Sequence, residues 1–198
     1  VGVAEGDRVV GWIALADTLK LDAAEAVAHL QALGLQPALV TGDNDRVAEA
    51  IAAELGIQDV RSEALPADKI EIVAAWQSRG EIVAAIGDGM NDAPALERAD
   101  VGIALGTGAD IALDSADIAI AGDELMAAVR AIALSQATFR RIKQNLTWAY
   151  GYNLVMLPIA MAGLLHPIMA EVAMALSSLT VIWNSLQLKR VRLPETIV

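Results

Sequence analysis

The sequence predicts an α/β domain with a parallel sheet, followed by a hairpin of two transmembrane helices. Apolar runs typical of strands alternate with helical segments through the first 122 residues, the order expected of parallel strands joined by right-handed crossovers. Residues 146–165 and 168–188 form two further runs that hold a single charge between them and can cross about 30 Å of hydrocarbon. Buried core helices are the alternative, but these seldom lack charges on every face.

Charge is divided unevenly along the 198 residues. Residues 1–147 carry 23 acidic and 11 basic side chains, a net charge of −12, whereas residues 148–198 carry 2 and 3, a net charge of +1. The acidic part argues against a nucleic-acid partner, which requires a basic surface. The chain has no cysteine, so it holds no disulfide or thiolate metal ligand. It opens on valine without a signal peptide, from which we expect a piece of a longer protein.

The elements of the first 122 residues follow from apolar runs and the residues that bound them. Strands are expected at 8–15, 36–40, near 60, 81–86, 101–105 and 118–120, and helices at 23–33, 45–55 and 67–79. Asp22 is the expected cap of the first helix, Gly34 ends that helix, and Pro66 opens the third. A connecting helix over 123–145 then leads to the two apolar runs.

The loop after strand 81–86 carries the strongest chemical signal. Glycines on both sides of Asp88 let the backbone turn sharply at the carboxyl end of a strand, where ligands bind in open α/β sheets. Asp88 and Asp92 lie four residues apart with Asn91 between them, and they offer the oxygen ligands that Mg²⁺ prefers. A polar turn with capping acids is the alternative, but a cap needs one acid and no pair of glycines.

Other polar groups are expected at the same edge of the sheet. They are Asp17 with Lys20, the turn Thr41-Gly42-Asp43, and Lys69. A hydroxyl, an ammonium and several carboxylates suit a phosphoryl group, because Thr41 can hydrogen-bond a phosphoryl oxygen and Lys69 can neutralise its charge. Each residue alone is a weak signal, since a lone lysine on a helix is usually a solvated surface group.

With these motifs the chain resembles the P-type ATPases over essentially all of its length. Thr41-Gly42-Asp43-Asn44 and Gly87–Leu96 look like the two hallmark motifs of their phosphorylation domain. The resemblance implies a haloacid-dehalogenase-like fold, ATP as substrate and Mg²⁺ as cofactor. It also implies a role for Lys69 against the phosphorylated aspartate and for Asp17 near the hinge with the nucleotide domain. The catalytic residues so implied are Asp17, Thr41, Gly42, Asp43, Lys69 and Asn91, and the Mg²⁺ ligands are Asp88 and Asp92.

The family's nucleophile is missing from the chain. It is an aspartate in an Asp-Lys-Thr-Gly-Thr motif, and neither that string nor the nucleotide-binding and actuator domains have a counterpart here. The resemblance therefore implies the carboxyl-terminal third of a pump, inactive alone, whose main partner is the missing amino-terminal part. Its expected segments are an incomplete phosphorylation domain (1–122), a connecting helix (123–145), two membrane helices (146–165 and 168–188) and a tail (189–198).

Basic residues predict how the hairpin lies in the lipid bilayer. Three precede the first span and three follow the second, namely Arg140, Arg141, Lys143, Lys189, Arg190 and Arg192, whereas the link between the spans has none. By the positive-inside rule, residues 1–145 and the tail are expected on the cytoplasmic side of a bacterial cell membrane.

Two short patterns in the spans indicate the transported ion. A chain that ends with two spans after the phosphorylation domain resembles the heavy-metal branch of the family. Within that branch, Tyr152-Asn153 in the first span and Met174 with Ser178 in the second match the patterns of the copper-transporting members. The resemblance implies Cu(I), with Ag(I) as a second cargo, these four residues as the ion pathway, and a copper chaperone as a further partner. Methionine thioether suits soft Cu(I), although methionine and serine also serve as packing residues.

Several alternatives remain open. Pumps for zinc, cadmium and lead are the nearest alternative to a copper pump. Their branch of the family is similar to this chain but is marked by a lysine in the first span and an aspartate in the second, and neither residue is present here. A phosphatase of the same fold fused to a membrane anchor would need its own nucleophilic aspartate, and a non-enzymatic membrane-bound module is the third possibility. Glu171, an acid within the second span, either aids ion release or sits in water at the interface.

Overall fold

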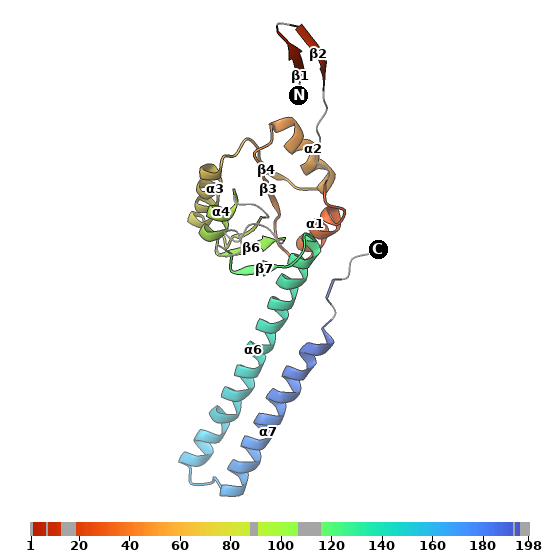
Figure 1. Cartoon of the computed structure of the whole chain (residues 1–198). Helices are drawn as coiled ribbons and strands as arrows, with labels where there is room; N and C mark the ends of the chain where they lie inside the picture. Colours follow the sequence, from red (N-terminus) through yellow and green to blue (C-terminus); the bar gives the residue numbers. More distant parts are fainter. Residues whose placement is uncertain are drawn as a thin grey trace.

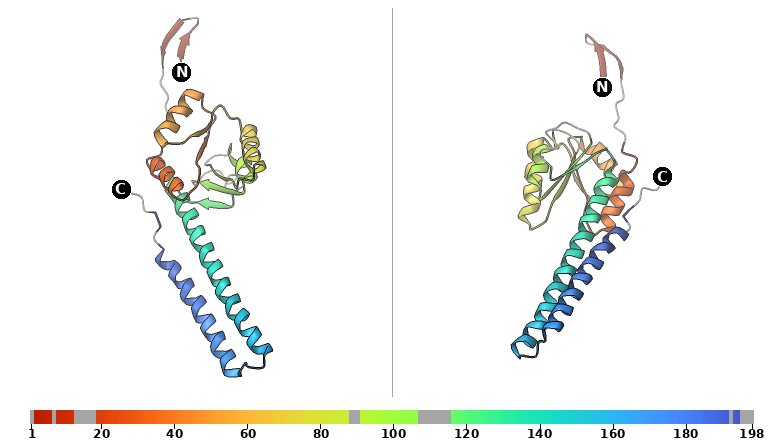
Figure 2. Two further views of the ribbon diagram at one scale, coloured as in Figure 1. Left: turned by 180° about the vertical axis from the view of Figure 1, so that it is seen from behind. Right: turned by 60° about the horizontal axis from the view of Figure 1, so that its bottom comes forward.

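The computed structural model describes residues 2–6, 8–12, 19–87, 91–106, 116–191 and 193–194. A small β-hairpin stands at one end, an α/β domain lies in the middle, and a long pair of helices extends from the far side of the domain (Figure 1). The further views in Figure 2 show the same arrangement.

The β-hairpin consists of β1 (Gly2–Glu5) and β2 (Arg8–Trp12), which pair antiparallel. The expected strand at 8–15 is thus observed over 8–12, but the expectation that it joins the parallel sheet is wrong. Gly6 turns the chain with a φ of 60°, which glycine reaches at little steric cost, and the turn brings the preceding segment alongside as the nearest partner.

The other strands are parallel, as the fold class requires. β3 (Ala38–Val40) pairs with β4 (Asp59–Arg61) in one sheet, while β5 (Ala84–Gly87), β6 (Val101–Leu105) and β7 (Ile118–Ile120) form another in the order β5-β6-β7. The described residues thus form two parallel sheets rather than one. β5 begins later than predicted because the Val83 N–H donates to the Asp100 side chain instead of a neighbouring strand.

Four helices belong to the domain; the first three match the predicted helices closely, and the fourth was not predicted. They are α1 (Ala23–Ala32), α2 (Asp45–Leu55), α3 (Pro66–Ser78) and α4 (Ala93–Arg98). The side chain of Asn44 caps α2 by accepting the Val47 N–H at 3.1 Å, and Pro66 opens α3. Gly34 follows α1 in the left-handed region. Asp22 stands at the N-cap position of α1 as predicted, but its side chain makes no capping hydrogen bond there and instead accepts the backbone N–H of Met126, at 2.8 Å, in another helix.

That other helix, α6 (Leu125–Met161), connects the domain to the helix pair. Its first turns are buried on both sides: Met126 and Val129 pack against Ala26 and Leu30 of α1, while Ala128 packs against the sheet that contains β6. The expected connecting helix and the first expected span are therefore one continuous helix. It runs beside α7 (Pro167–Leu186), which passes into the short helix η1 (Gln187–Arg190).

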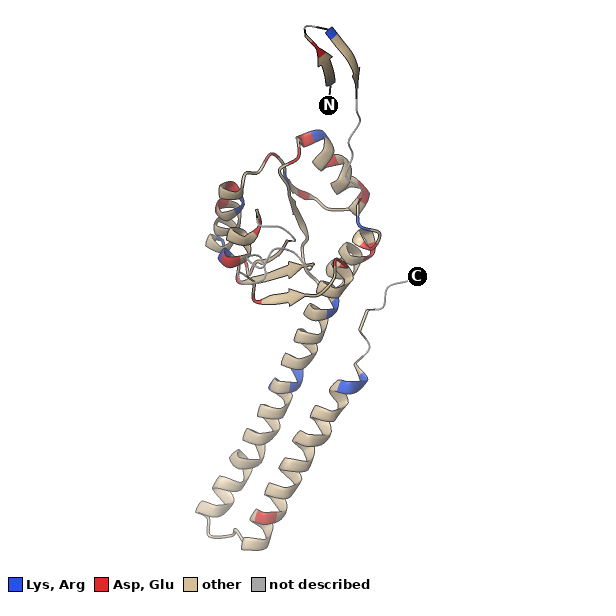
Figure 3. Ribbon diagram, viewed as in Figure 1, with Lys and Arg blue, Asp and Glu red and all other residues tan. Residues whose placement is uncertain are grey.

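The helix pair differs from the domain in charge and burial. Charged residues gather on the domain and are sparse along the helices (Figure 3). Among the described residues, one helix, Pro167–Arg190, is long and apolar enough to cross a membrane, and none of its most apolar window is buried. The part of α6 after Lys143 is uncharged too, but its Tyr, Trp and Asn side chains lower its mean hydropathy. Exposed apolar helices of this kind are not the buried core helices of a soluble domain.

Gly102 in β6 allows α4 to lie directly against the sheet. A Cβ added at this glycine would lie 2.6 Å from the carbonyl oxygen of Leu96 and 3.0 Å from its carbon, both backbone atoms that cannot move aside. Glycine is therefore required here for packing rather than for turning.

We expect Gly102→Ala to destabilise the chain by about 1–3 kcal/mol, because the added methyl group forces α4 away from β6. Denaturant unfolding of the chain in detergent, followed by tryptophan fluorescence, measures this change. Gly11→Ala is the control, since a Cβ there meets no atom within 4 Å. Equal stability of the two variants would contradict the predicted contact.

Candidate active site

The central contact of the candidate site joins Lys69 to Asp92. Lys69 lies in the first turn of α3 and Asp92 immediately precedes α4, and the lysine Nζ lies 2.6 Å from the carboxylate Oδ1. Both side chains are largely covered, with 17% and 24% of their surfaces exposed. A short, partly buried ion pair is better shielded from solvent than one on the surface, so it holds the lysine ammonium in place at this end of β5.

The backbone at the end of β5 is shaped to admit Asp92. A Cβ added at Gly87 would lie 2.6 Å from the Asp92 Cβ and 2.9 Å from its carboxylate. The glycine that the sequence marks as a turning point therefore also makes room for the side chain. Asn91, in the turn before Asp92, is exposed to solvent.

The second group lies at the carboxyl end of β3. Thr41 Oγ1 donates to Asp43 Oδ2 at 2.8 Å and accepts the Asp43 N–H at 3.1 Å, so the hydroxyl and the carboxylate are held together across Gly42. The loop after β4 supports this turn: Ala64 N–H donates to the Thr41 carbonyl, and Glu63 N–H donates to the Asp43 carbonyl. Glu63 adopts a φ of 51°, a conformation that costs energy for a residue with a side chain.

One short segment links the two groups. Ala64 bonds the turn at Thr41, and the next residue, Leu65, precedes the first turn of α3, which carries Lys69. Asp68 strengthens this start of the helix by accepting the Leu65 N–H at 2.8 Å. Among the described residues, no direct hydrogen bond or ion pair joins Thr41 or Asp43 to Lys69 or Asp92.

Two of the predicted site residues, Asp17 and Asp88, lie outside the described residues. Of the two expected Mg²⁺ ligands, Asp92 is therefore the one whose position the structure gives. Within the described part of the chain, no three His, Cys, Asp or Glu side chains gather into a metal site. Asp92 presents one carboxylate oxygen to an ammonium group, and a carboxylate in that setting remains an anionic oxygen donor suited to Mg²⁺.

Lys20, predicted beside Asp17 at the sheet edge, contacts a different element. Its Nζ donates to the carbonyl of Asp123, just before α6, while the neighbouring Asp22 caps the start of that helix. The sequence did not reveal these contacts, because about a hundred residues separate the partners. Lys20 and Asp22 thus connect the segment after residue 18 to the first turn of α6.

Asp100 fixes α3 and β5 to the turn between α4 and β6. Its carboxylate accepts the Val83 N–H at 2.9 Å and the Gln77 side-chain amide at 3.0 Å. These two donors, the backbone one first, hold the pKa of Asp100 below its ordinary value of 3.8. The elements that carry Lys69 and Asp92 are therefore joined through a carboxylate that the sequence reading missed.

The residues expected in the ion pathway lie on the helix pair. Tyr152 is half-buried between α6 and α7, with its ring 6.3 Å from that of Trp148. Asn153, Met174 and Ser178 are exposed, and the Asn153 side chain donates to the carbonyl of Ala149 in its own helix. Within the described part of the chain, no side-chain hydrogen bond joins these four residues to one another.

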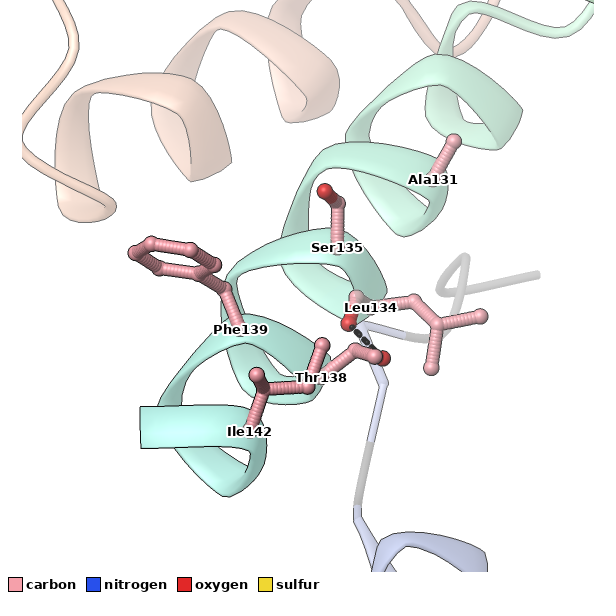
Figure 4. A pocket seen from close by; sticks show the side chains of 6 residues that line it. All are labelled: Ala131, Leu134, Ser135, Thr138, Phe139 and Ile142. Atoms are coloured by element: carbon pink, nitrogen blue, oxygen red, sulfur yellow. Dashed lines mark hydrogen bonds between the residues drawn. The ribbon is translucent and has the colours of Figure 1, made fainter. Parts of the chain in front are cut away.

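A shallow hollow also occurs on α6, but it is far from the strand ends. Figure 4 shows its lining by Ala131, Leu134, Ser135, Thr138, Phe139 and Ile142. The hydroxyl of Thr138 already donates to the carbonyl of Leu134, and no charged side chain lines the hollow. It has the character of an exposed apolar helix surface, not of a phosphate site.

We expect the stability of the chain to depend on pH through Asp100. Because its pKa is lowered in the fold, the ionised carboxylate stabilises the chain above pH 3.8, and this contribution is lost as the pH falls through the lowered pKa. Asp100→Asn should therefore flatten the fall in melting temperature below about pH 4. Thermal unfolding of both chains at several pH values measures the slopes, and equal slopes would contradict the assignment.

Comparison with known proteins identifies the family to which the chain belongs. A family model of haloacid dehalogenase-like hydrolases matches residues 2–100, half of the chain, and a second model of that description matches residues 70–131. A zinc-transporting PIB-type ATPase in its E2.Pi state superposes with a TM-score of 0.82 at 41% identity, over 94% of this chain and 31% of that one.

Two curated relatives are copper pumps. The chain is 51% identical over 190 residues to the probable copper-exporting P-type ATPase V of Mycobacterium tuberculosis, covering 96% of this chain and 25% of that protein. It is 49% identical over 191 residues to the copper-exporting P-type ATPase of Staphylococcus aureus, covering 96% and 24%. It thus spans about a quarter of the length of these relatives. The chain belongs to the haloacid dehalogenase-like hydrolase family, and within that family it is similar to copper-exporting and zinc-transporting P-type ATPases.

Proposed function

We propose that the chain is the phosphorylation-domain and closing membrane part of a P-type ATPase that exports Cu(I), and also Ag(I), from a bacterial cell. The observation that carries the proposal is the partly buried contact between Lys69 and Asp92 at the carboxyl end of β5. It joins Asp92 of the second hallmark motif to Lys69, 23 positions earlier, which the family resemblance assigns to the same phosphoryl site. The relatives at about half identity support the same activity.

In this proposal the chain supplies the groups that surround a phosphoryl group, and ATP is its source. Lys69 neutralises charge on the phosphoryl oxygens, while Thr41, held by Asp43, donates a hydrogen bond. Asp88 and Asp92 would hold Mg²⁺, which when bound neutralises further phosphate charge. Asn91 supports that site, and Asp17 is assigned to the hinge with the nucleotide domain. The nucleophilic aspartate comes from the amino-terminal part of the same pump.

The sheet edges support a place for that missing part. β3 and β5 both lie at the edge of their sheets, and both end in site residues. A strand that paired with both would carry an aspartate at its carboxyl end between Thr41 and Asp92. Ile82, just before β5, is 86% exposed, as expected of an apolar residue that another segment covers.

The burial pattern of the helix pair supports a shared ion pathway. On each helix the half-buried residues mark the face against its partner, and Asn153, Met174 and Ser178 lie to one side of that face. Seen from one end, antiparallel helices wind in opposite senses, so residues that follow the contact face by about 100° lie on the same side of both. Asn153 and Met174 are also at similar depth, about 12 and 10 Å from the link between the helices.

The flanking charges support the orientation of the hairpin. Basic residues stand midway along α6, just before its uncharged part, and directly after α7, and the link carries none. We therefore place the domain and the tail in the cytoplasm, with the bilayer around the pair and a copper chaperone as a delivery partner. Zinc is the second candidate cargo, because the superposed zinc-transporting structure shares this fold.

Substitutions at the catalytic site should abolish phosphoenzyme formation from radiolabelled ATP in the full-length pump. Lys69→Met removes the ammonium, and Gly87→Ala forces Asp92 out of place; each should lower the rate of phosphorylation at least about 100-fold. Gly11→Ala, which meets no neighbouring atom, should leave the rate unchanged. Near-normal phosphorylation of Lys69→Met would remove the lysine from the site.

The choice of ion can be tested with two methionines on one helix. Met174 lies on the proposed pathway side of α7, whereas Met169 lies on the other side of its contact face. Phosphorylation of the full-length pump should be stimulated by Cu(I) and Ag(I) but not by Zn²⁺, should lose this stimulation in Met174→Ala, and should keep it in Met169→Ala. Stimulation by Zn²⁺ that survives Met174→Ala would favour the zinc alternative.

A further inference from the structure

The contact face between α6 and α7 has two chemically different parts. Toward the link, the half-buried residues are mostly small or apolar, and Tyr152 and Thr180 lie among them: Ala149, Gly151, Met156, Ile159, Ala170, Ala173, Ser177 and Val181. At the end nearest the domain the same face is polar, with Arg141 and Asn145 on α6 opposite Asn184 on α7. The polar residues take the positions at which helical periodicity would place the next apolar contacts.

These side chains form one connected hydrogen-bond network. Arg141 Nη1 donates to Asn184 Oδ1 at 2.6 Å, Asn184 Nδ2 donates to Asn145 Oδ1 at 2.8 Å, and Asn145 Nδ2 donates to Ser185 Oγ at 2.9 Å. Among the described residues, these are the only side-chain hydrogen bonds that join α6 to α7.

Other polar side chains of the pair bond within their own helix. The hydroxyls of Thr147 and Thr180 donate to carbonyls four residues earlier, as does the amide of Asn153. Such bonds satisfy a polar group in an apolar environment without fixing a neighbouring helix. The network of Arg141, Asn145, Asn184 and Ser185 therefore does something that the rest of the pair does not.

Its geometry restricts how α7 can lie on α6. A face of small and apolar residues can slide or rotate by a fraction of a turn and repack at little cost. A partly buried chain of directional bonds is satisfied in one register, and a shift leaves polar groups unpaired. Single buried asparagines set the register of paired helices in this way.

We propose that Arg141, Asn145, Asn184 and Ser185 are positioning residues that hold α7 in one register on α6. They thereby set the position of Met174 and Ser178 against Tyr152 and Asn153. The inference rests on the proposed function, since it assigns a task to the network only if these four residues contact the ion. The network stands about 15 Å along α7 from Met174, so it acts through the helix and does not bind the ion.

The test uses the full-length pump in lipid vesicles and the Cu(I) concentration that half-saturates phosphorylation by ATP. Asn145→Ala and Asn184→Ala should each raise this concentration about tenfold, and the double variant should be no worse than either, because each breaks the same network. Asn184→Asp keeps an acceptor for Arg141 and should stay within about threefold of wild type. Thr180→Ala is the matched control, because it removes a hydroxyl one turn away that bonds only its own helix.

A second readout separates positioning from general damage. Phosphorylation by inorganic phosphate with Mg²⁺ but without Cu(I), the reverse of hydrolysis, needs the domain but no transported ion, so it should be equal in all variants. The inference is overturned if Asn145→Ala and Asn184→Ala match Thr180→Ala, or if their effects multiply in the double variant. In either case Cu(I)-stimulated phosphorylation of the wild type, lost in Met174→Ala, would leave the proposed function standing. If the wild type ignores Cu(I), both fall.

Discussion

The first turns of α6 are packed on two sides, and the arrangement of the whole chain depends on that packing. Met126 and Val129 are completely buried against α1, and Ala128 is completely buried against the sheet. Asp22 and Lys20 add polar contacts to the same helix start. A helix anchored by burial, by capping and by a charged group cannot turn independently of its domain. The exposed helix pair is therefore oriented by the core of the acidic domain.

The candidate site shows how short loops can bring charged groups together without a large cavity. Gly87 admits Asp92, Asp92 holds Lys69, and the segment before α3 supports the turn at Thr41. Each of these contacts follows a strand end, where side chains converge. Among the described residues, β3 and β5 lie at the edges of their sheets, and in the proposed function a further strand between them would carry the nucleophilic aspartate.

Local signals predicted the fold well where they were complete. The bounds of α2, β6 and β7 agree with the sequence because α2 has an asparagine cap and a closing glycine and the two strands are uninterrupted apolar runs. Asp22 was placed correctly at the start of α1, but its side chain bonds another helix 104 residues away, which no local pattern indicates. β1 was missed because its pairing partner lies within the same short hairpin, and not in the sheet.

The same distinction applies to the site. The glycines and Asp92 could be predicted as a group because their motif is local and specific, and Lys69 was added by the family resemblance, whereas the support from Asp100 depends on contacts across 17 and 23 residues that no motif marks. The network of Asn145 and Asn184 escaped notice because hydropathy averages over all faces of a helix and does not reveal which face a polar residue occupies. Asp17 and Asp88 lie outside the described residues.

Because α6 is one continuous helix, a small rotation at its buried first turns moves its far end over a larger distance. The 37 residues of the helix extend about 55 Å, and the end that is fixed in the domain is its buried first turns. A tilt of only about 5° at that end displaces the far end by about 5 Å, close to the 5.4 Å pitch of one helical turn. A small rotation of the domain, which leaves its own packing unchanged, therefore displaces the far end of α6 by a distance comparable to the diameter of a metal ion's coordination shell.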